Sequence, residues 1–329
     1  MQHRVAQVSA LVAGGLRLRT MADGSSRVRS WRPDWPCPVA LNLAPYRHGG
    51  GDPTFRTLTG GTIVMARQTP SGAGTIAIRS HPSDGLVEAE AWGAGADWLL
   101  EQLPRLLGAG DDVSGFEPPR PLADVWRRHS HWRIGASDTV FESLLPAIIE
   151  QKVTGQEAFA GYRNLVRRFG EPAPGPEKVR VRLAPTADAV RQIPSWEWLR
   201  LPVDQGRSRP LLRAASVASS LERALGGGPE ALDRALQSLP GIGRWTSAEV
   251  RSRALGDPDA VSFGDYHVAK DIGWALLGRE VDDDELEVIL EPYRPHRLRV
   301  QGLVALAGLG RPRRGPRMAP RRHLPGGYL

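Results

Sequence analysis

The chain has 329 residues, of which 41% are hydrophobic and 24% charged, and its formal net charge is +7 with a pI near 10.1. This composition is typical of a globular protein of two or three domains, and no apolar run has the eighteen or so residues of a membrane helix. The single cysteine, Cys37, excludes internal disulfides and four-cysteine metal sites.

The basic charge favours a polyanionic partner. Lys152, Lys178 and Lys270 are the only lysines, so most of this charge is arginine, which suits bidentate contact with phosphate. A GC-rich genome that encodes arginine in place of lysine is the alternative explanation.

Residues 1–30 resemble neither a folded segment nor a signal peptide. The run ALVAGGL is too short and glycine-rich for a signal peptide, and RLRTMADGSSRVRS is basic and poor in acids. We therefore expect a disordered basic extension, with Met21 as a second candidate for the start of translation.

Residues 31–118 are predicted to form a small β-rich domain. The runs GTIVMARQT, GTIAIRSH and GLVEAEAWG are separated by the turn sequences SGAG and HPSDG, which predicts an antiparallel meander. The stretch ADWLLEQLPRLLG has helical spacing, so we expect a helix packed on the sheet. The stretch GDDVSGFEPPRP, at 110–121, has the composition of a linker.

Residues 119–310 are predicted to be all-α, because the hydrophobic period changes to 3.6. Thr139 and Glu142 fit a capping box, and Pro146 should kink the first helix or lie in its first turn. Further helices are expected near 186–192, 207–225, 229–238, 244–255, 265–277 and 283–290, before a last apolar helix. Residues 311–329 form an arginine-rich tail without acidic residues, which we expect to be disordered.

The stretch LPGIGRWTSAEV, at 239–250, ends one helix and begins another. Pro240 stops the first helix, while Gly241 and Gly243 allow positive φ and close approach of the backbone. Such a turn leaves N–H groups unpaired at the start of the next helix, where the dipole adds positive charge. A DNA-phosphate site is therefore predicted, with an ordinary interhelical turn as the alternative. The expected contacts are Leu239, Gly241, Gly243, Arg244 and Thr246.

With DAVSFGDYHVAK (259–270) about twenty residues later, this hairpin resembles the helix-hairpin-helix (HhH-GPD) DNA glycosylases, most closely the 3-methyladenine DNA glycosylase II type. The resemblance runs from about residue 38 to 310, and LLPAIIEQKVTGQEA (144–158) is similar to the central helix of that family. It implies an α+β fold, in which a small N-terminal antiparallel β-sheet and helix domain precedes an all-α helix-hairpin-helix glycosylase domain.

The resemblance also implies base excision repair of alkylated purines, with damaged double-stranded DNA as the partner. It implies no organic cofactor and no metal held by side chains, although a monovalent or divalent cation at the hairpin backbone would fit the family. We expect a cytoplasmic, nucleoid-associated monomer that does not contact a membrane.

Asp265 matches the catalytic Asp of the family's loop. An ionised carboxylate stabilises the positive charge that develops on the sugar and can orient or deprotonate the attacking water. A helix N-cap is the alternative role. Gly264 stands where the family usually has Pro or Asp. An N-alkylated purine is already cationic and leaves without a dedicated acid, so one carboxylate fits an alkylated base.

Relatives that also nick DNA carry a Schiff-base lysine where this chain has Trp245, so the resemblance implies a monofunctional hydrolase. The indole can stack on an extruded base or belong to the core. Glu249 follows on the same helical face and either faces a cationic base or pairs with Arg253 at the surface. Tyr266 and His296 are assigned to the base pocket, the latter where some relatives have a tryptophan.

Gln151 and Lys152 match the family's duplex wedge, with a phosphate contact or plain solvent exposure as alternatives. The departures at Gly264, Glu249 and His296 leave two other functions open. One is a non-catalytic, structure-selective DNA-binding protein. The other is a glycosylase for oxidised or deaminated bases.

Overall fold

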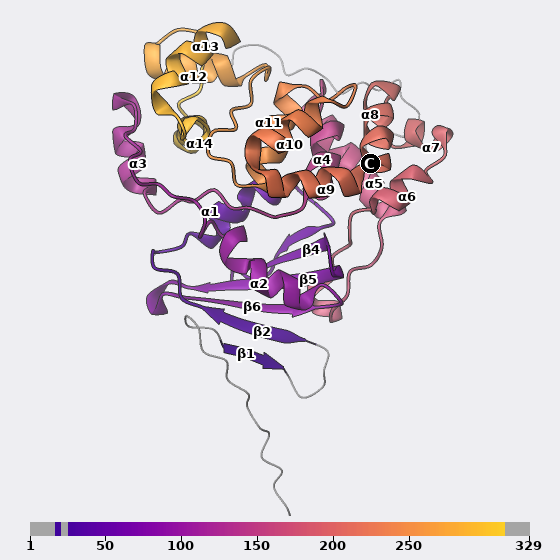
Figure 1. Ribbon diagram of the computed structural model, residues 1–329. Coiled ribbons are helices and arrows are strands. Elements are labelled where there is room, and N and C mark those ends of the chain that lie inside the picture. Colours follow the sequence, from indigo (N-terminus) through magenta and orange to yellow (C-terminus); the bar gives the residue numbers. More distant parts are fainter. Residues whose placement is uncertain (1–16, 21–25, 313–329) are drawn as a thin grey trace, which may run out of the picture.

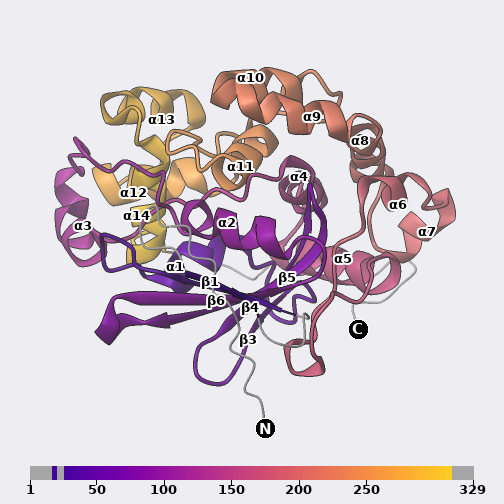
Figure 2. The same cartoon turned by 60° about the horizontal axis from the view of Figure 1, so that its bottom comes forward.

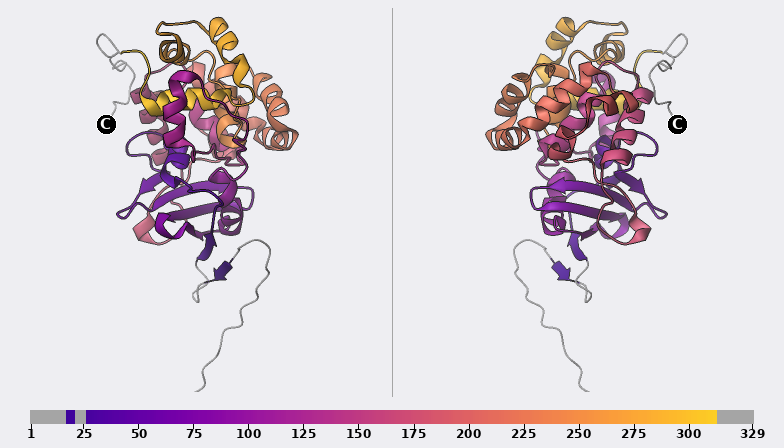
Figure 3. Two further views of the ribbon diagram at one scale, coloured as in Figure 1. Left: turned by 90° about the vertical axis from the view of Figure 1, so that its left-hand side faces the viewer. Right: turned by 90° about the vertical axis from the view of Figure 1, so that its right-hand side faces the viewer.

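The computed structural model describes residues 17–20 and 26–312, which form two layers (Figure 1). The lower layer is a six-stranded antiparallel sheet in the order β1-β2-β6-β5-β4-β3, and helices form the upper layer (Figure 3). The strands are β1 (Arg17–Thr20), β2 (Arg27–Trp31), β3 (Phe55–Thr57), β4 (Ile63–Thr69), β5 (Gly72–His81) and β6 (Leu86–Trp92). This arrangement confirms the predicted α+β class with an N-terminal antiparallel sheet.

Two helices, α1 (Val39–Leu43) and α2 (Ala96–Leu106), accompany the sheet. The others are α3 (Ala123–His129), α4 (Val140–Ile149), α5 (Gly155–Phe169), α6 (Ala187–Arg191), α7 (Ser195–Arg200), α8 (Gln205–Ser216), α9 (Ala218–Ala224), α10 (Gly228–Gln237), α11 (Arg244–Ala254), α12 (Val268–Leu277), α13 (Asp283–Leu290) and α14 (Arg297–Ala307). Within residues 17–20 and 26–312, none of them combines the length and apolar character that a membrane span requires.

Strand β1 and residues 27–30 of β2 lie inside the segment predicted to be disordered, so that prediction is wrong for these residues. The reason is a buried charge in β2. Arg29 takes an inward position and donates hydrogen bonds to the carbonyls of Leu100 and Glu101 in α2. A charged residue at a core position interrupts the alternation of apolar and polar residues by which a strand is predicted. Residues 1–16 and 21–25 lie outside the described residues.

Both faces of the sheet are covered. In β4, Ile63 and Met65 belong to the core shared with α1 and α2, whereas Val64 and Ala66 belong to a cluster on the opposite face. That second cluster is completed by residues 172–183, which follow α5 and return to the sheet. This segment after α5 therefore packs on the N-terminal layer.

The helical layer contains two separate hydrophobic cores, and Figure 2 shows their helices as an arc above α2. One core surrounds the almost fully buried α4 and includes residues of α5, α8, α10 and α11. The other is formed by α12, α13 and α14 with Phe116 and Leu122. The hairpin between α10 and α11 is attached to the first core, and the loop leading into α12 is attached to the second.

The predicted linker at 110–121 is packed into this second core by a buried ion pair. The side chains of Asp111 and of Arg299 in α14 both have relative exposures of 0%, and Nη2 of the arginine lies 2.6 Å from Oδ1 of the aspartate. The rings of Phe116, Trp126 and Trp132 surround the guanidinium, each centroid 5.7 Å away. The pair fastens the chain that leaves the sheet to the last helix.

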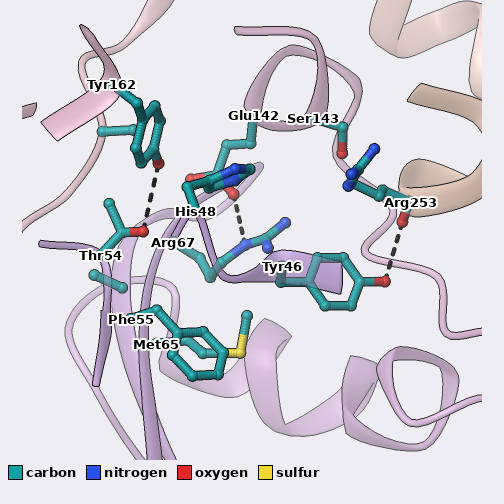
Figure 4. Close-up of a pocket in the computed structure, with 12 residues that line it drawn as sticks. Tyr46, His48, Thr54, Phe55, Met65, Arg67, Glu142, Ser143, Tyr162 and Arg253 are labelled. Carbon is teal, nitrogen blue, oxygen red and sulfur yellow. Dashed lines mark hydrogen bonds and ion pairs between the residues drawn. The ribbon is translucent and has the colours of Figure 1, made fainter. Parts of the chain in front are cut away.

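A small polar cavity of about 30 Å³ lies where the sheet meets the helices (Figure 4). Here Glu142 pairs with Arg67 of β4 at 2.6 Å, and burial raises the pKa of Glu142. The predicted capping box of Thr139 and Glu142 is therefore wrong, because the glutamate faces the sheet. Pro146 lies inside α4. Tyr46 donates to the carbonyl of Arg253 at 3.1 Å across the same cavity.

We expect Asp111→Asn to lower the free energy of unfolding by about 3–5 kcal/mol, because it leaves the Arg299 guanidinium buried without a counter-ion. Urea unfolding at neutral pH measures the change. Asp188→Asn is the matched control, since Asp188 forms an exposed pair with Arg191 and should contribute less than about 1 kcal/mol. Equal losses in the two variants would contradict this account of the buried pair.

Candidate active site

The hairpin between α10 and α11 depends on one glycine. Gly241 has φ of +97°, and a Cβ atom at this position would lie 2.4 Å from Cγ of Pro210. Both the left-handed conformation and the close contact therefore require glycine. Gly243 differs, because its φ is −105° and a Cβ atom added there would meet nothing within 4 Å. The expectation of a positive φ holds only for Gly241.

Gln151 holds the hairpin in place from the end of α4. Its Nε2 donates to the carbonyl of Gly241 at 3.0 Å and to Oγ1 of Thr246 at 2.8 Å. Thr246 is 2% exposed, so its hydroxyl supports the turn from inside and does not face solvent. Leu239 packs partly buried against the core around α4. The side chain predicted as a wedge therefore braces the hairpin.

Arg244 opens α11 and is exposed, but it already has partners. It forms an ion pair with Glu287 of α13, and its guanidinium lies 4.8 Å from the ring centroid of Phe263. To contact a phosphate, Arg244 would have to break its ion pair with Glu287.

The carbonyls of Leu239, Pro240 and Gly241 each accept a hydrogen bond, from Ile242, Arg213 and Gln151 respectively. A guanidinium beside Pro240 disfavours a second cation there. The cation expected at the hairpin backbone stays a prediction. Among the described residues, no group of three or more His, Cys, Asp or Glu side chains could hold a metal ion.

Asp265 lies at the start of α12. Its Oδ1 accepts hydrogen bonds from the backbone N–H groups of His267 at 2.7 Å and Val268 at 3.1 Å. The helix N-terminus favours this negative charge. Within the described residues Oδ2 makes no hydrogen bond, and the side chain is half-buried. Asp265 is not the N-cap of α12, which is His267, but one of its oxygens accepts from the backbone that leads into the helix and the other stays available.

The loop before Asp265 touches the first turn of α11. Gly264 has φ of +87°, and a Cβ at this position would lie 3.8 Å from Cβ of Trp245. A proline, one of the two residues expected here from the resemblance, could not adopt this φ. The N–H of Gly264 donates to Oδ2 of Asp283 at 2.9 Å. The structure thus brings the half-buried Trp245 beside the loop that carries Asp265.

Glu249 does not face an open pocket. Its carboxylate pairs with Arg253 at 2.6 Å and accepts a hydrogen bond from Oγ of Ser262 at 2.5 Å. Of the two roles considered for Glu249, pairing with Arg253 is confirmed, but the pair is largely buried and not at the surface. Sequence reasoning misses Ser262, Gln301 and Asp283. Ser262 lies within the DAVSFGDYHVAK motif, which is its only signal.

Tyr266 is 68% exposed and points away from the core. The Nζ atom of Lys270 lies 3.8 Å from its ring centroid and Cζ of Arg311 lies 5.5 Å from it. A hydrogen bond from Arg311 and the charge of Lys270 lower the pKa of Tyr266. Tyr266 therefore lies on an open, locally cationic surface. Residues 313–329, the rest of the predicted tail, are outside the described residues.

His296 lies elsewhere in the helical layer. It is 7% exposed, packs against Phe116 at a ring distance of 5.5 Å, and borders a cavity of about 300 Å³ with Asp112 and Ser114. In the described part of the chain, no hydrogen bond or ring contact joins His296 to Trp245 or Asp265.

Lys152 occupies the exposed turn between α4 and α5 with φ of +54°. This conformation is unfavourable for a residue with a Cβ atom. Two neighbours fix the turn: Glu150 contacts His48 at 3.3 Å, and Gln151 holds the hairpin. Among the described residues Lys152 forms no ion pair, so its ammonium is available to a ligand.

We expect Gly241→Ala to lower the free energy of unfolding by about 1–3 kcal/mol, because it combines a positive φ with a clash against Pro210. Affinity for duplex DNA should fall as the turn is displaced. Gly243→Ala is the control, and its cost should stay below about 1 kcal/mol. Urea unfolding and fluorescence anisotropy with duplex DNA measure both effects, and equal behaviour of the two variants would refute the assignment.

No family model matches the chain. Two curated proteins of Mycobacterium tuberculosis, each described as a probable bifunctional transcriptional activator/DNA repair enzyme AlkA, are 26% identical over 140 residues. The match covers 43% of this chain and 27% of the relative, so the chain spans only about a quarter of the length of these proteins.

Solved structures match over nearly the whole chain. A 3-methyladenine DNA-glycosylase from Archaeoglobus fulgidus has a TM-score of 0.69 at 18% identity, covering 85% of this chain and 98% of that protein. An 8-oxoguanine glycosylase/lyase from Clostridium acetobutylicum, in complex with double-stranded DNA, has a TM-score of 0.67 at 12% identity, covering 89% and 97%. The chain therefore has the fold of the helix-hairpin-helix DNA glycosylases that its sequence resembles.

Proposed function

We propose that this protein is a monofunctional DNA glycosylase that extrudes an alkylated purine from duplex DNA and hydrolyses its bond to deoxyribose. One observation carries the proposal: the loop of Asp265 lies against the first turn of α11, where Trp245 stands beside a glycine hairpin. The fold and the AlkA-like stretch of sequence support the same reaction class.

Asp265 supplies the negative charge for the reaction. As the N-glycosidic bond breaks, its electron pair goes to the base, and positive charge develops on the sugar at C1′. The carboxylate stabilises that charge, with Oδ1 held by two backbone N–H groups and Oδ2 directed to the reacting centre. Water then bonds to C1′, and its proton passes to Oδ2 or to solvent.

Trp245 gives the extruded base a stacking surface. A cationic purine stacks well on an electron-rich indole, and it leaves as a neutral base once it has taken the electron pair. Because no amine occupies position 245, the proposed reaction ends at the abasic site without a Schiff base. An oxidised purine is the second candidate substrate, since one structural neighbour is described as an 8-oxoguanine glycosylase/lyase.

The hairpin and the Lys152 turn bind the duplex in this proposal. The N-terminus of α11 attracts a phosphate, which Arg244 reaches by exchanging Glu287. Lys152 follows Gln151 in the exposed turn, and in this proposal it enters the space of the extruded nucleotide or contacts the opposite strand. Strain of the kind seen at Lys152 is common where a side chain must be held out toward a ligand.

We expect Asp265→Asn to lower the single-turnover rate constant for base release by at least about 100-fold, because the substitution removes the charge that stabilises the oxocarbenium-like state. The dissociation constant for the same duplex should change less than about threefold. The measurement uses duplexes that each carry one 3-methyladenine, 7-methylguanine, 8-oxoguanine or uracil. If the protein binds the duplexes but releases no base, the DNA-binding alternative holds. If it releases only uracil or 8-oxoguanine, the proposal of an alkylated substrate is wrong.

We expect Lys152→Gly to separate stability from activity. Glycine relieves the positive φ and should raise the free energy of unfolding by about 0.5–1 kcal/mol. Release of an alkylated base should fall about tenfold as the side chain is lost. Lys152→Gln keeps the strained backbone and removes only the charge, so its stability should match the wild type. A glycine variant with full activity would exclude Lys152 from the wedge.

A further inference from the structure

Three side chains from three elements meet at Ser262, in the loop that carries Asp265. Oγ of Ser262 donates to Oε1 of Glu249 in α11 at 2.5 Å and accepts from Nε2 of Gln301 in α14 at 3.1 Å. The backbone N–H of Ser262 donates to Oε1 of Gln301 at 3.0 Å. Ser262 is buried, so these bonds form away from solvent, where hydrogen bonds are strongest.

The Glu249 end of this network is fixed to the rest of the molecule. Its second oxygen pairs with Arg253, whose Nε donates to the carbonyl of Pro45 at 3.0 Å. Tyr46 donates to the carbonyl of Arg253, as Figure 4 shows. Through Arg253, the Glu249 side chain of α11 is connected to the segment that follows α1. Glu249 cannot turn toward a base without breaking several buried contacts.

The Ser262 end leads directly to the carboxylate. The N–H of Asp265 donates to the carbonyl of Ser262 at 3.2 Å, closing the turn that contains Gly264. Asp283 holds Gly264 from the other side. Ser262 is thus the point where the turn presenting Asp265 is attached to α11, the helix that begins with Arg244 and Trp245.

We propose that Glu249 and Gln301 are positioning residues, which act through Ser262 to hold Asp265 at a fixed place relative to Trp245. The inference rests on the proposed function for its catalytic meaning. A displacement of the order of 1 Å at a reacting group can reduce a rate about 100-fold, so a buried polar anchor near the carboxylate has a direct effect on turnover. In this proposal Glu249 fixes the position of the Asp265 loop relative to α11 and does not recognise the base.

A double-mutant cycle tests the proposal with the full-length chain and a duplex that carries one 7-methylguanine. Ser262→Ala should lower the single-turnover rate constant about tenfold. Glu249→Gln should lower it less, and the double variant should be no slower than Ser262→Ala because both changes break one connection. The dissociation constant for the duplex should change less than about twofold. Additive losses, or equal effects on rate and affinity, would overturn the proposal.

Ser247→Ala is the matched control. Ser247 is a buried serine of α11, and its Oγ donates to Oδ1 of Asp233 at 2.6 Å, away from the loop. It should reduce thermal stability about as much as Ser262→Ala while the rate at 25 °C, well below unfolding, stays within about twofold. A rate loss in Ser247→Ala equal to that in Ser262→Ala would mean that general destabilisation explains both.

Amide hydrogen exchange of the DNA-free protein separates this inference from the proposed function. Ser262→Ala should speed exchange of the Ser262 and Asp265 amides, and leave the β4 amides unchanged. If the wild type releases no base but exchange responds in this way, the glycosylase proposal fails and the anchoring of the loop stands. If the wild type releases base, but the variants change neither the rate constant nor the amide exchange, the positioning role alone fails.

Discussion

The candidate site depends on a hydrogen bond that crosses between two hydrophobic cores. Trp245 belongs to the helix packed on the core around α4, whereas the loop of Asp265 leads into the core of α12, α13 and α14. Apolar packing is non-directional, so it fixes each half well and their relative position poorly. The bond from Ser262 to Glu249 supplies the missing directional constraint. The site is precise because polar groups are buried at the boundary.

Arginine has two distinct uses in this protein, which changes how the basic composition is interpreted. Arg29, Arg207 and Arg299 are buried, and each donates to carbonyls or to a carboxylate within the chain. A planar, multi-donor group suits such interior bridges better than lysine does. Part of the excess positive charge therefore stabilises the fold, and net charge alone overstates the surface offered to a polyanion. Lys152 and Lys270, in contrast, stand beside the proposed DNA site.

Local features of this chain are predictable from its sequence, whereas partners distant in the sequence are not. The hairpin and the placement of Asp265 at a helix start follow from Pro, Gly and carboxylate chemistry within a few residues. The capping box at Thr139 is wrong because a strand supplies the partner of Glu142. The sequence leaves two roles open for Glu249 for the same reason, since Ser262 approaches it only in the folded chain. The fold class is predictable because the hydrophobic period of a helix or strand can be read without knowing which other element it packs against.

The chain after α5 that returns to cover the second face of the sheet links the two layers thermodynamically. Without residues 172–183, Val64, Ala66 and Trp92 would present an apolar surface to water, so the second face of the sheet depends on a segment that follows α5. We therefore expect the two layers to unfold together, and a cut near residue 118 to leave the second face of the sheet without the segment that covers it.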